Sequence, residues 1–230
     1  MVDVITISNF LIMLITGIIL SLLTRKIYAR KNKLLLEKAF GLGMLNACIA
    51  SFIGALFQIP YILSVTELQS WFIGSYIYYV FVILSLGFVL SCGIGILAGN
   101  ERVKLGFVSF IAVIPLTLAY LLGYVEQKPG TADMSSTIEG IILLYGVVGL
   151  LLAIIAVIYL KIYLYTRVRS SGLMFTGITI IIIGAALGGV ADILSGELGR
   201  MFDPVGFLTT LAGIYIIYSG FNRRPSSKSI

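Results

Sequence analysis

Residues 71–98 read WFIGSYIYYVFVILSLGFVLSCGIGILA and contain no Asp, Glu, Lys or Arg. A helix needs about 20 predominantly apolar residues to cross the hydrocarbon core of a bilayer, and this stretch is longer than that. A helix on the surface of a soluble protein keeps a polar face, which this segment lacks. The stretch therefore predicts a membrane-spanning helix.

The rest of the chain has the same character. Hydrophobic residues make up 59% of the 230 residues and charged residues 11%, with a mean hydropathy of +1.08. A soluble domain carries about 25% charged residues. We therefore expect an all-α polytopic bundle of seven transmembrane helices over residues 1–222, followed by a short basic tail at 223–230. The expected spans are residues 5–24, 39–63, 71–98, 104–123, 138–160, 172–194 and 204–221.

Loop residues mark several helix ends. Ser170-Ser171-Gly172 precedes the sixth span, and Lys161, Arg167 and Arg169 fall in the connection before it. Asp203-Pro204 is a good start for the seventh span, with the carboxylate as N-cap and proline in the first turn.

The basic residues predict the orientation of the bundle. Fourteen of the 16 Lys and Arg residues lie on one set of alternate connections, which the positive-inside rule assigns to the cytoplasm. The N-terminus is then outside, the C-terminus is in the cytoplasm, and the chain is a multi-pass protein of the cell membrane. The cytoplasmic face would also attract anionic lipid headgroups. We favour this interpretation over nucleic-acid binding, because the cluster from Arg25 to Lys38 has only Tyr28 as an aromatic for base stacking.

A weak internal repeat relates the two halves of the chain. A shift of 135 residues aligns Phe40 with Phe175, and Gly54 with Gly189. These matches suggest three helices, a linking helix and three more in the same orientation, a parallel repeat used by some transporters. The layout resembles that of the SWEET sugar carriers and of microbial opsins. The opsin lysine is missing from residues 204–221, so we exclude retinal.

Small residues recur at helical spacing in three spans. Such residues let helix backbones approach closely in lipid, so we expect spans 2, 3 and 6 to pack together inside the bundle, with spans 1 and 4 facing lipid. The same spacing also serves dimerisation, which leaves open a homo-oligomer or a membrane partner protein. The packing residues are Gly54, Gly87, Ser91, Gly95, Gly184 and Gly188.

Three polar residues are candidates for a solute site. Asn46 and Gln58 both lie in span 2, but twelve residues turn a helix to about 120° from the starting direction, which weakens the case for a shared site. We expect Asn46 to hydrogen-bond a neighbouring helix. Asp192 lies within a turn of the outer end of span 6, where it can bind a cation or polar solute together with Asp203 or Glu197. We favour the alternative that it stays hydrated at the interface or pairs with Arg200, because a charge near a helix end is easily kept in water.

Aromatic residues gather at both ends of the spans. Tyr78 and Tyr79, with Trp71, Phe72 and Tyr76, predict an outer belt or a platform for a sugar or headgroup, and Tyr159, Tyr163 and Tyr165 predict an inner belt.

The residue types present argue against an enzyme. The chain has no histidine, no acid pair within a span and no metal-ligand spacing, so we expect no catalytic site, no metal and no cofactor. Two functions remain. The first is a carrier or pore for an uncharged or weakly polar solute, and the second is a non-catalytic sensor, scaffold or subunit acting through a partner.

Overall fold

The computed structural model describes residues 4–29, 35–62, 68–98, 125–127, 134–136, 138–194 and 197–222. Six long helices fill most of this part of the chain. Two short antiparallel strands, β1 and β2, lie between α3 and α5 in the sequence and were not predicted. At their centre, Glu126 pairs with Ser135. The helices are α1 (Val4–Tyr28), α2 (Leu35–Ile62), α3 (Leu68–Ala98), α5 (Ile138–Thr166), α6 (Arg169–Ile193) and α7 (Glu197–Asn222), and the strands are β1 (Val125–Gln127) and β2 (Met134–Ser136).

All six helices are long and apolar enough to cross a membrane. The prediction of a helical, multi-pass membrane protein is therefore confirmed for these six spans. The expected span at 104–123 lies outside the described residues. Each helix extends beyond the apolar run that predicted it, because polar residues at a helix end can stay hydrated while the backbone remains helical.

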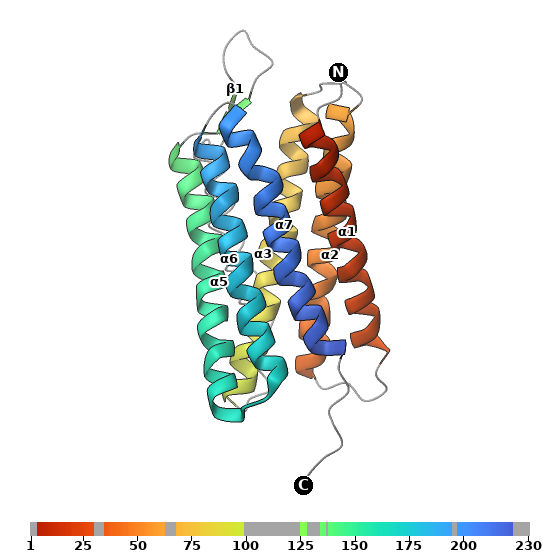
Figure 1. The fold of residues 1–230 in the computed structure, drawn as a ribbon, viewed down its shortest axis with the longest axis vertical. Coiled ribbons are helices and arrows are strands. Elements are labelled where there is room, and N and C mark those ends of the chain that lie inside the picture. The colour runs from red at the N-terminus through yellow and green to blue at the C-terminus, as the bar shows by residue number, and fades with distance from the viewer. Residues whose placement is uncertain are drawn as a thin grey trace.

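The six helices form a closed ring in chain order. Contacts link α1 to α2, α2 to α3, α3 to α5, α5 to α6, α6 to α7, and α7 back to α1. Figure 1 shows the helices running along the long axis of the molecule. Neighbours along the chain run in opposite directions, except that α3 and α5 run in the same direction. The first turn of α1 and the two strands lie at one end, called here the strand end, and the turn between α5 and α6 lies at the opposite end.

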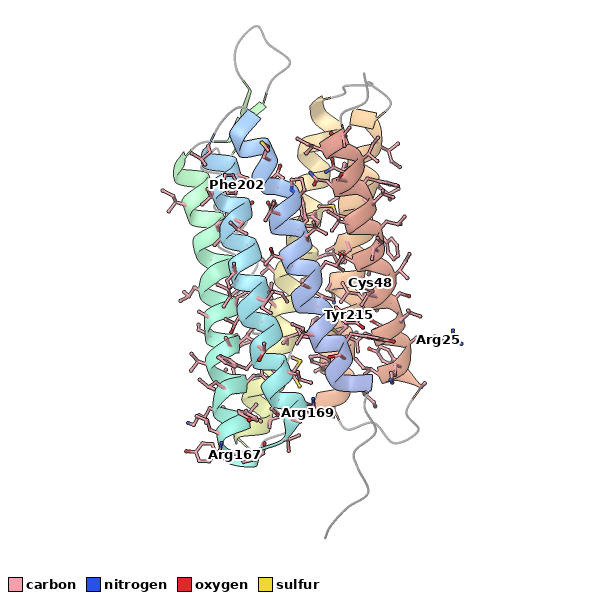
Figure 2. The ribbon with its side chains drawn as sticks, viewed as in Figure 1. Arg25, Cys48, Arg167, Arg169, Phe202 and Tyr215 are labelled. Carbon is pink, nitrogen blue, oxygen red and sulfur yellow. The ribbon has the colours of Figure 1, made fainter. Side chains whose placement is uncertain are left out.

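The charged side chains mark that opposite end. Arg25, Arg167 and Arg169 all lie there, whereas Phe202 lies near the strand end (Figure 2). We call it the basic end. Lys38 and Lys161 are also solvent-exposed members of the basic connections.

The turn between α5 and α6 is tighter than expected. Helix α5 continues to Thr166, so Lys161 is helical, and α6 begins at Arg169, so Ser170, Ser171 and Gly172 are inside its first turn. The Thr166 hydroxyl donates to the Ile162 carbonyl at 2.8 Å and accepts from the Val168 N–H at 3.3 Å. These bonds satisfy helix-end groups without a loop.

Arg167 carries the backbone strain of this turn. Its φ is +55°, in the left-handed region that costs a non-glycine residue about 1–2 kcal/mol. We predict that Arg167→Gly stabilises the protein by about 0.5–1 kcal/mol, since part of the relief is lost to the greater freedom of unfolded glycine. The measurement is the midpoint of unfolding in detergent. Arg167→Ala is the control, because it removes the same charge but keeps the Cβ; an equal gain from alanine would refute the strain argument.

Helix α7 begins earlier than the sequence suggested. It starts at Glu197 rather than at Asp203-Pro204, so the prediction that Asp203 caps this helix is wrong, and Pro204 lies inside it. Proline has no N–H, so the carbonyl four residues earlier loses its helical partner. The result is a locally weakened helix next to Asp203, a residue that sequence reasoning had placed at a wet helix end.

Helices α6 and α7 form the most intimate pair of the bundle. A Cβ placed on Gly177 would lie 2.7 Å from the carbonyl oxygen of Gly213, and one placed on Gly184 would lie 2.8 Å from that of Gly206. The second pair lies two helical turns from the first, and two turns further Ala191 lies against Gly199. Backbones at this separation leave no room for a side chain. Small residues therefore face each other along both helices, a type of contact that stabilises helix pairs in lipid.

The expected grouping of spans 2, 3 and 6 differs from this arrangement. Helix α2 does pack on α3, but the main contacts of α6 are with α5 and α7. Gly184 and Gly188 were predicted packing residues, but the glycines of α7 that face them were not. Because a small residue permits close approach without naming the partner, the pairing could not be read from α6 alone.

The other packing residues lie on the inner side of their helices. Gly54 faces Met13 of α1 and Tyr78 of α3, and a Cβ there would lie 2.7 Å from the Met13 sulfur. Gly87 and Gly95 are buried in α3, and the buried Ser91 hydroxyl donates to the Gly87 carbonyl at 2.8 Å. Serine therefore satisfies its hydroxyl within its own helix while staying small.

Candidate functional site

A cavity of about 350 Å³ lies inside the helix ring, toward the strand end. Ligand sites typically have volumes of about 300–1,000 Å³, so this one suits a small molecule. All six described helices contribute to its wall. Its lining is Asn9 and Met13 of α1, Gly54, Phe57 and Gln58 of α2, Tyr78, Tyr79, Val82 and Leu86 of α3, Tyr145, Val148 and Leu152 of α5, Ile181, Gly184, Ala185 and Gly188 of α6, and Asp203, Gly206, Phe207 and Thr210 of α7.

Asn9 is the most buried polar side chain of this wall. It is only 6% exposed, and its Oδ1 atom has no hydrogen-bond partner. A buried acceptor left without a donor costs about 1–3 kcal/mol, so such atoms are rare and call for an explanation. Asn9 lines the cavity but its Oδ1 atom is itself shielded, so a rotation of the side chain would present this atom to a molecule inside the cavity.

Asp203 brings a carboxylate to the same cavity. It is half-buried and already takes part in an interaction within the protein. A carboxylate has about four acceptor sites, so one interaction leaves capacity for others. Asp203 is the only Asp, Glu, Lys or Arg among the described lining residues, and it gives the cavity a negative character.

Aromatic rings surround these polar groups. Tyr78 and Tyr79 are half-buried and meet edge to face, with ring centroids 5.1 Å apart. Both line the cavity, whereas residues of an outer aromatic belt would face the membrane interface. The side chains of the other predicted belt residues, Trp71, Phe72 and Tyr76, lie outside the described ones. Tyr145 closes the α5 side, where its hydroxyl would lie 3.6 Å from a Cβ on Gly188. A Cβ on Gly188 would thus meet only this ring, although the Gly188 backbone nitrogen would lie 3.2 Å from a Cβ placed on Gly206 of α7.

The tyrosines of the predicted inner aromatic belt do not share one environment. Tyr159 is 4% exposed and lies in the hydrophobic core, whereas Tyr165 is 76% exposed at the end of α5. Burial follows from the helix rotation, since six residues place these two rings on different faces. Only the exposed tyrosine has the setting expected of an interfacial residue.

A second cavity of about 180 Å³ continues the first toward the basic end. Its wall is almost wholly apolar, with Leu20, Met44, Ile155 and Met174 among its residues. The two cavities share eight lining residues, so they are adjacent. These are Met13, Tyr78, Val82, Leu86, Leu152, Ile181, Phe207 and Thr210.

A close-packed apolar layer follows the second cavity. Leu23 and Ile155 are fully buried, and Ile27, Ala39 and Phe40 continue the core toward the basic end. Among the described residues, these packed side chains lie between the cavities and the basic end.

The predicted solute residues separate in space. Gln58 is half-buried and lines the polar cavity. Asn46 lines neither cavity, and its amide donates to the Leu42 carbonyl of its own helix at 2.8 Å rather than to a neighbouring helix. Asp192 belongs to the last turn of α6, and its side chain lies outside the described ones. The three residues are not brought together as one described site.

A continuous polar path through the bundle is likewise absent from the described residues. Ser85 lines the apolar cavity, but Thr179 and Thr209 line neither cavity and bond to carbonyls of their own helices. A hydroxyl bonded to the preceding turn needs no other partner and can face lipid or packed neighbours. The polar cavity therefore occupies one half of the bundle only.

Asn9 was missed from the sequence, and Asp203 was predicted as a helix cap and as a partner for Asp192, not as a residue of this cavity. Asn9 was an available signal, because an asparagine inside the apolar run 5–24 must find a polar partner or a cavity. Asp203 was hidden by the misplaced start of α7, since a residue at a helix end is free to meet water. Only the observed start at Glu197 places this carboxylate beside the cavity.

The cysteines and acids form no metal site in the described part of the chain. No group of three or more His, Cys, Asp or Glu residues there could hold a metal ion. Cys48 and Cys92 are buried and form no disulfide, and the Cys48 thiol donates to the Gly17 carbonyl of α1 at 3.4 Å. Both behave as small residues of the core.

Comparison with known proteins identifies no family in which a similar site is known. No protein-family model matches the chain, and no curated protein matches it either.

Proposed function

We propose that the protein is a membrane carrier for a small polar solute, which occupies the cavity lined by Asn9, Gln58 and Asp203. The observation that carries the proposal is the arrangement of the space inside the ring. A polar compartment large enough for a small molecule lies next to an apolar compartment, and packed side chains lie between these compartments and the basic end. A carrier needs a binding site near the middle of the membrane that is closed on one side at a time.

The positive-inside rule supports an orientation with the strand end outside. Arg25, Arg167 and Arg169 lie at the opposite end of the ring, which this orientation places in the cytoplasm beside anionic headgroups. The ends of the described segments support a seventh crossing at 104–123. Helix α3 ends at the basic end and β1 lies at the strand end, so the chain between them passes from one end to the other.

Transport would then require the apolar layer to separate. In this proposal the structure represents the form with access from the strand end. The glycine contacts of α6 and α7 make these two helices a single unit, and the weakened turn at Pro204 lies beside the cavity. Movement of this pair against α1–α3 would open the basic end, in the manner of rigid-body rocking between two halves.

Filling the cavity tests the proposal. Val82 lines both compartments, so Val82→Trp is expected to block the space without removing a polar group. Val157 is 64% exposed on α5, so Val157→Trp adds the same bulk on the outside of the ring. The measurement is uptake of radiolabelled glycerol, glucose and ethanolamine into proteoliposomes, with protein-free liposomes as the background.

The wild-type protein should take up at least one of these solutes in a saturable manner. Val82→Trp should reduce that uptake by about tenfold or more, equivalent to about 1.4 kcal/mol, while Val157→Trp should leave it unchanged. Size-exclusion chromatography in detergent checks that both variants fold. Equal uptake by the two tryptophan variants, or uptake no faster than in protein-free liposomes, would contradict the carrier function.

A non-catalytic sensor or membrane subunit is the second candidate. The packed apolar layer favours it, because a receptor needs a ligand cavity but no path through the membrane. The exposed basic end gives a surface for a partner or for anionic lipid. Ligand binding without any uptake in the same proteoliposomes would favour this second function over the first.

A further inference from the structure

We propose that the cavity binds a small organic cation carrying N–H donors, a primary amine in its ammonium form. The inference rests on the proposed function for the use of this cavity as the substrate site, and it adds the chemical class of the ligand. Three independent features of the wall support it: an acceptor without a partner, a carboxylate and a set of aromatic rings.

The free acceptor is Oδ1 of Asn9. Its side chain is 94% buried, lines the cavity and has one amide oxygen without a donor. When the side chain turns this shielded oxygen toward the cavity, the atom that satisfies it is an N–H or O–H donor of the ligand or of water. An ammonium group carries three such donors and no acceptor, so it suits a wall that holds an amide oxygen and a carboxylate.

The carboxylate of Asp203 decides between an ammonium group and an uncharged donor. It lies on α7 and Asn9 lies on α1, two helices in direct contact, and both residues line the same cavity. No Lys or Arg occurs among the described lining residues, so a cationic ligand meets no like charge there. A negative group in a site of low dielectric attracts a cation more strongly than it would in water.

The aromatic rings suit the apolar and cationic parts of the same ligand. Phe57, Tyr78, Tyr79, Tyr145 and Phe207 all line the cavity. Faces of aromatic rings attract cations through their quadrupole, and they also pack against an alkyl or aryl substituent. A small amine with an apolar group therefore matches both the chemistry and the volume of the compartment.

Binding of benzylamine to the protein in lipid nanodiscs tests the inference, with benzyl alcohol as an uncharged analogue of the same size. Isothermal titration calorimetry should show that benzylamine binds at least about tenfold more tightly than benzyl alcohol. Asn9→Leu should weaken benzylamine binding about tenfold or more, and Asp203→Asn about a hundredfold, as expected for hydrogen bonds to a charged group and for a lost charge pair.

Asn46→Leu is the matched control, because it replaces the same residue type at a position that lines neither cavity. It should leave benzylamine binding unchanged. A folding defect is excluded by thermal unfolding of each variant without ligand. Asn9→Leu should unfold at the same temperature as the wild type or higher, since it removes an unsatisfied acceptor.

The possible outcomes separate this inference from the carrier function. Benzyl alcohol binding as tightly as benzylamine, no binding of benzylamine at millimolar concentration, or equal binding by wild type, Asn9→Leu and Asp203→Asn would each overturn the ligand class. Binding with the expected variant effects but without uptake of ethanolamine, glycerol or glucose into proteoliposomes would support the ligand class and contradict the carrier function.

Discussion

Gly213→Leu is expected to prevent stable folding of the bundle, or to lower its free energy of unfolding by about 3 kcal/mol or more. A Cβ at this position would already lie 2.6 Å from the Gly177 carbonyl oxygen and 2.7 Å from Cγ1 of Ile181. The carbonyl belongs to a helix backbone and cannot turn away. A leucine therefore forces α6 and α7 apart, and the separation also breaks the neighbouring contact of Gly184 with Gly206.

The control for this substitution is Gly149→Leu on α5. A Cβ on Gly149 would meet no atom within 4 Å, so a side chain has room there. Leucine also favours a helix more than glycine does, by up to about 1 kcal/mol. Thermal unfolding in detergent should show a large loss for Gly213→Leu and none for Gly149→Leu. Similar stability of the two variants would show that α6 and α7 are not packed backbone to backbone.

Leu23→Ala is expected to lower the free energy of unfolding by about 2 kcal/mol. Leu23 is fully buried in the apolar layer between the cavities and the basic end. The unfolded helix in a bilayer is already in an apolar solvent, so the loss arises from missing contacts and from the new void rather than from transfer to water. The same change should also widen the apolar compartment.

Its neighbour provides the control. Leu22 has the same side chain but is 49% exposed on the outside of α1. Leu22→Ala should change the free energy of unfolding by no more than about 0.5 kcal/mol, because lipid replaces the lost atoms. Chemical unfolding in mixed micelles measures both variants. A larger loss for Leu22→Ala than for Leu23→Ala would reverse the assignment of the inner and outer faces of α1.

The sequence predicts most of the spans because their length and lack of charge leave few alternatives. The run at 71–98 and the helix Leu68–Ala98 differ by three residues at one end. The helix ends are harder to predict, since Glu197 and Arg169 are polar and yet helical. A helix forms wherever its backbone hydrogen bonds are satisfied, whereas the apolar pattern marks only those helix residues that lie in lipid or in the protein core.

The cavity was beyond sequence reasoning for a different reason. Asn9, Gln58 and Asp203 are separated by many residues and meet only because α1, α2 and α7 belong to one closed ring. The hydropathy pattern predicts that each helix crosses the membrane, but it does not predict which helices are neighbours. Small residues gave part of that information in α6, and the matching glycines of α7 completed it.

The central claim is that a solvent-accessible cavity lies inside the helix ring and is reached from the strand end. Thr210 and Thr209 test it most directly, because they are adjacent on α7 and only Thr210 lines the cavity. With Cys48 and Cys92 replaced by alanine, Thr210→Cys should react with aminoethyl methanethiosulfonate added from the side of the strand end, and Thr209→Cys should not. Equal labelling of the two cysteines, or labelling of Thr210→Cys only from the side of the basic end, would contradict the account.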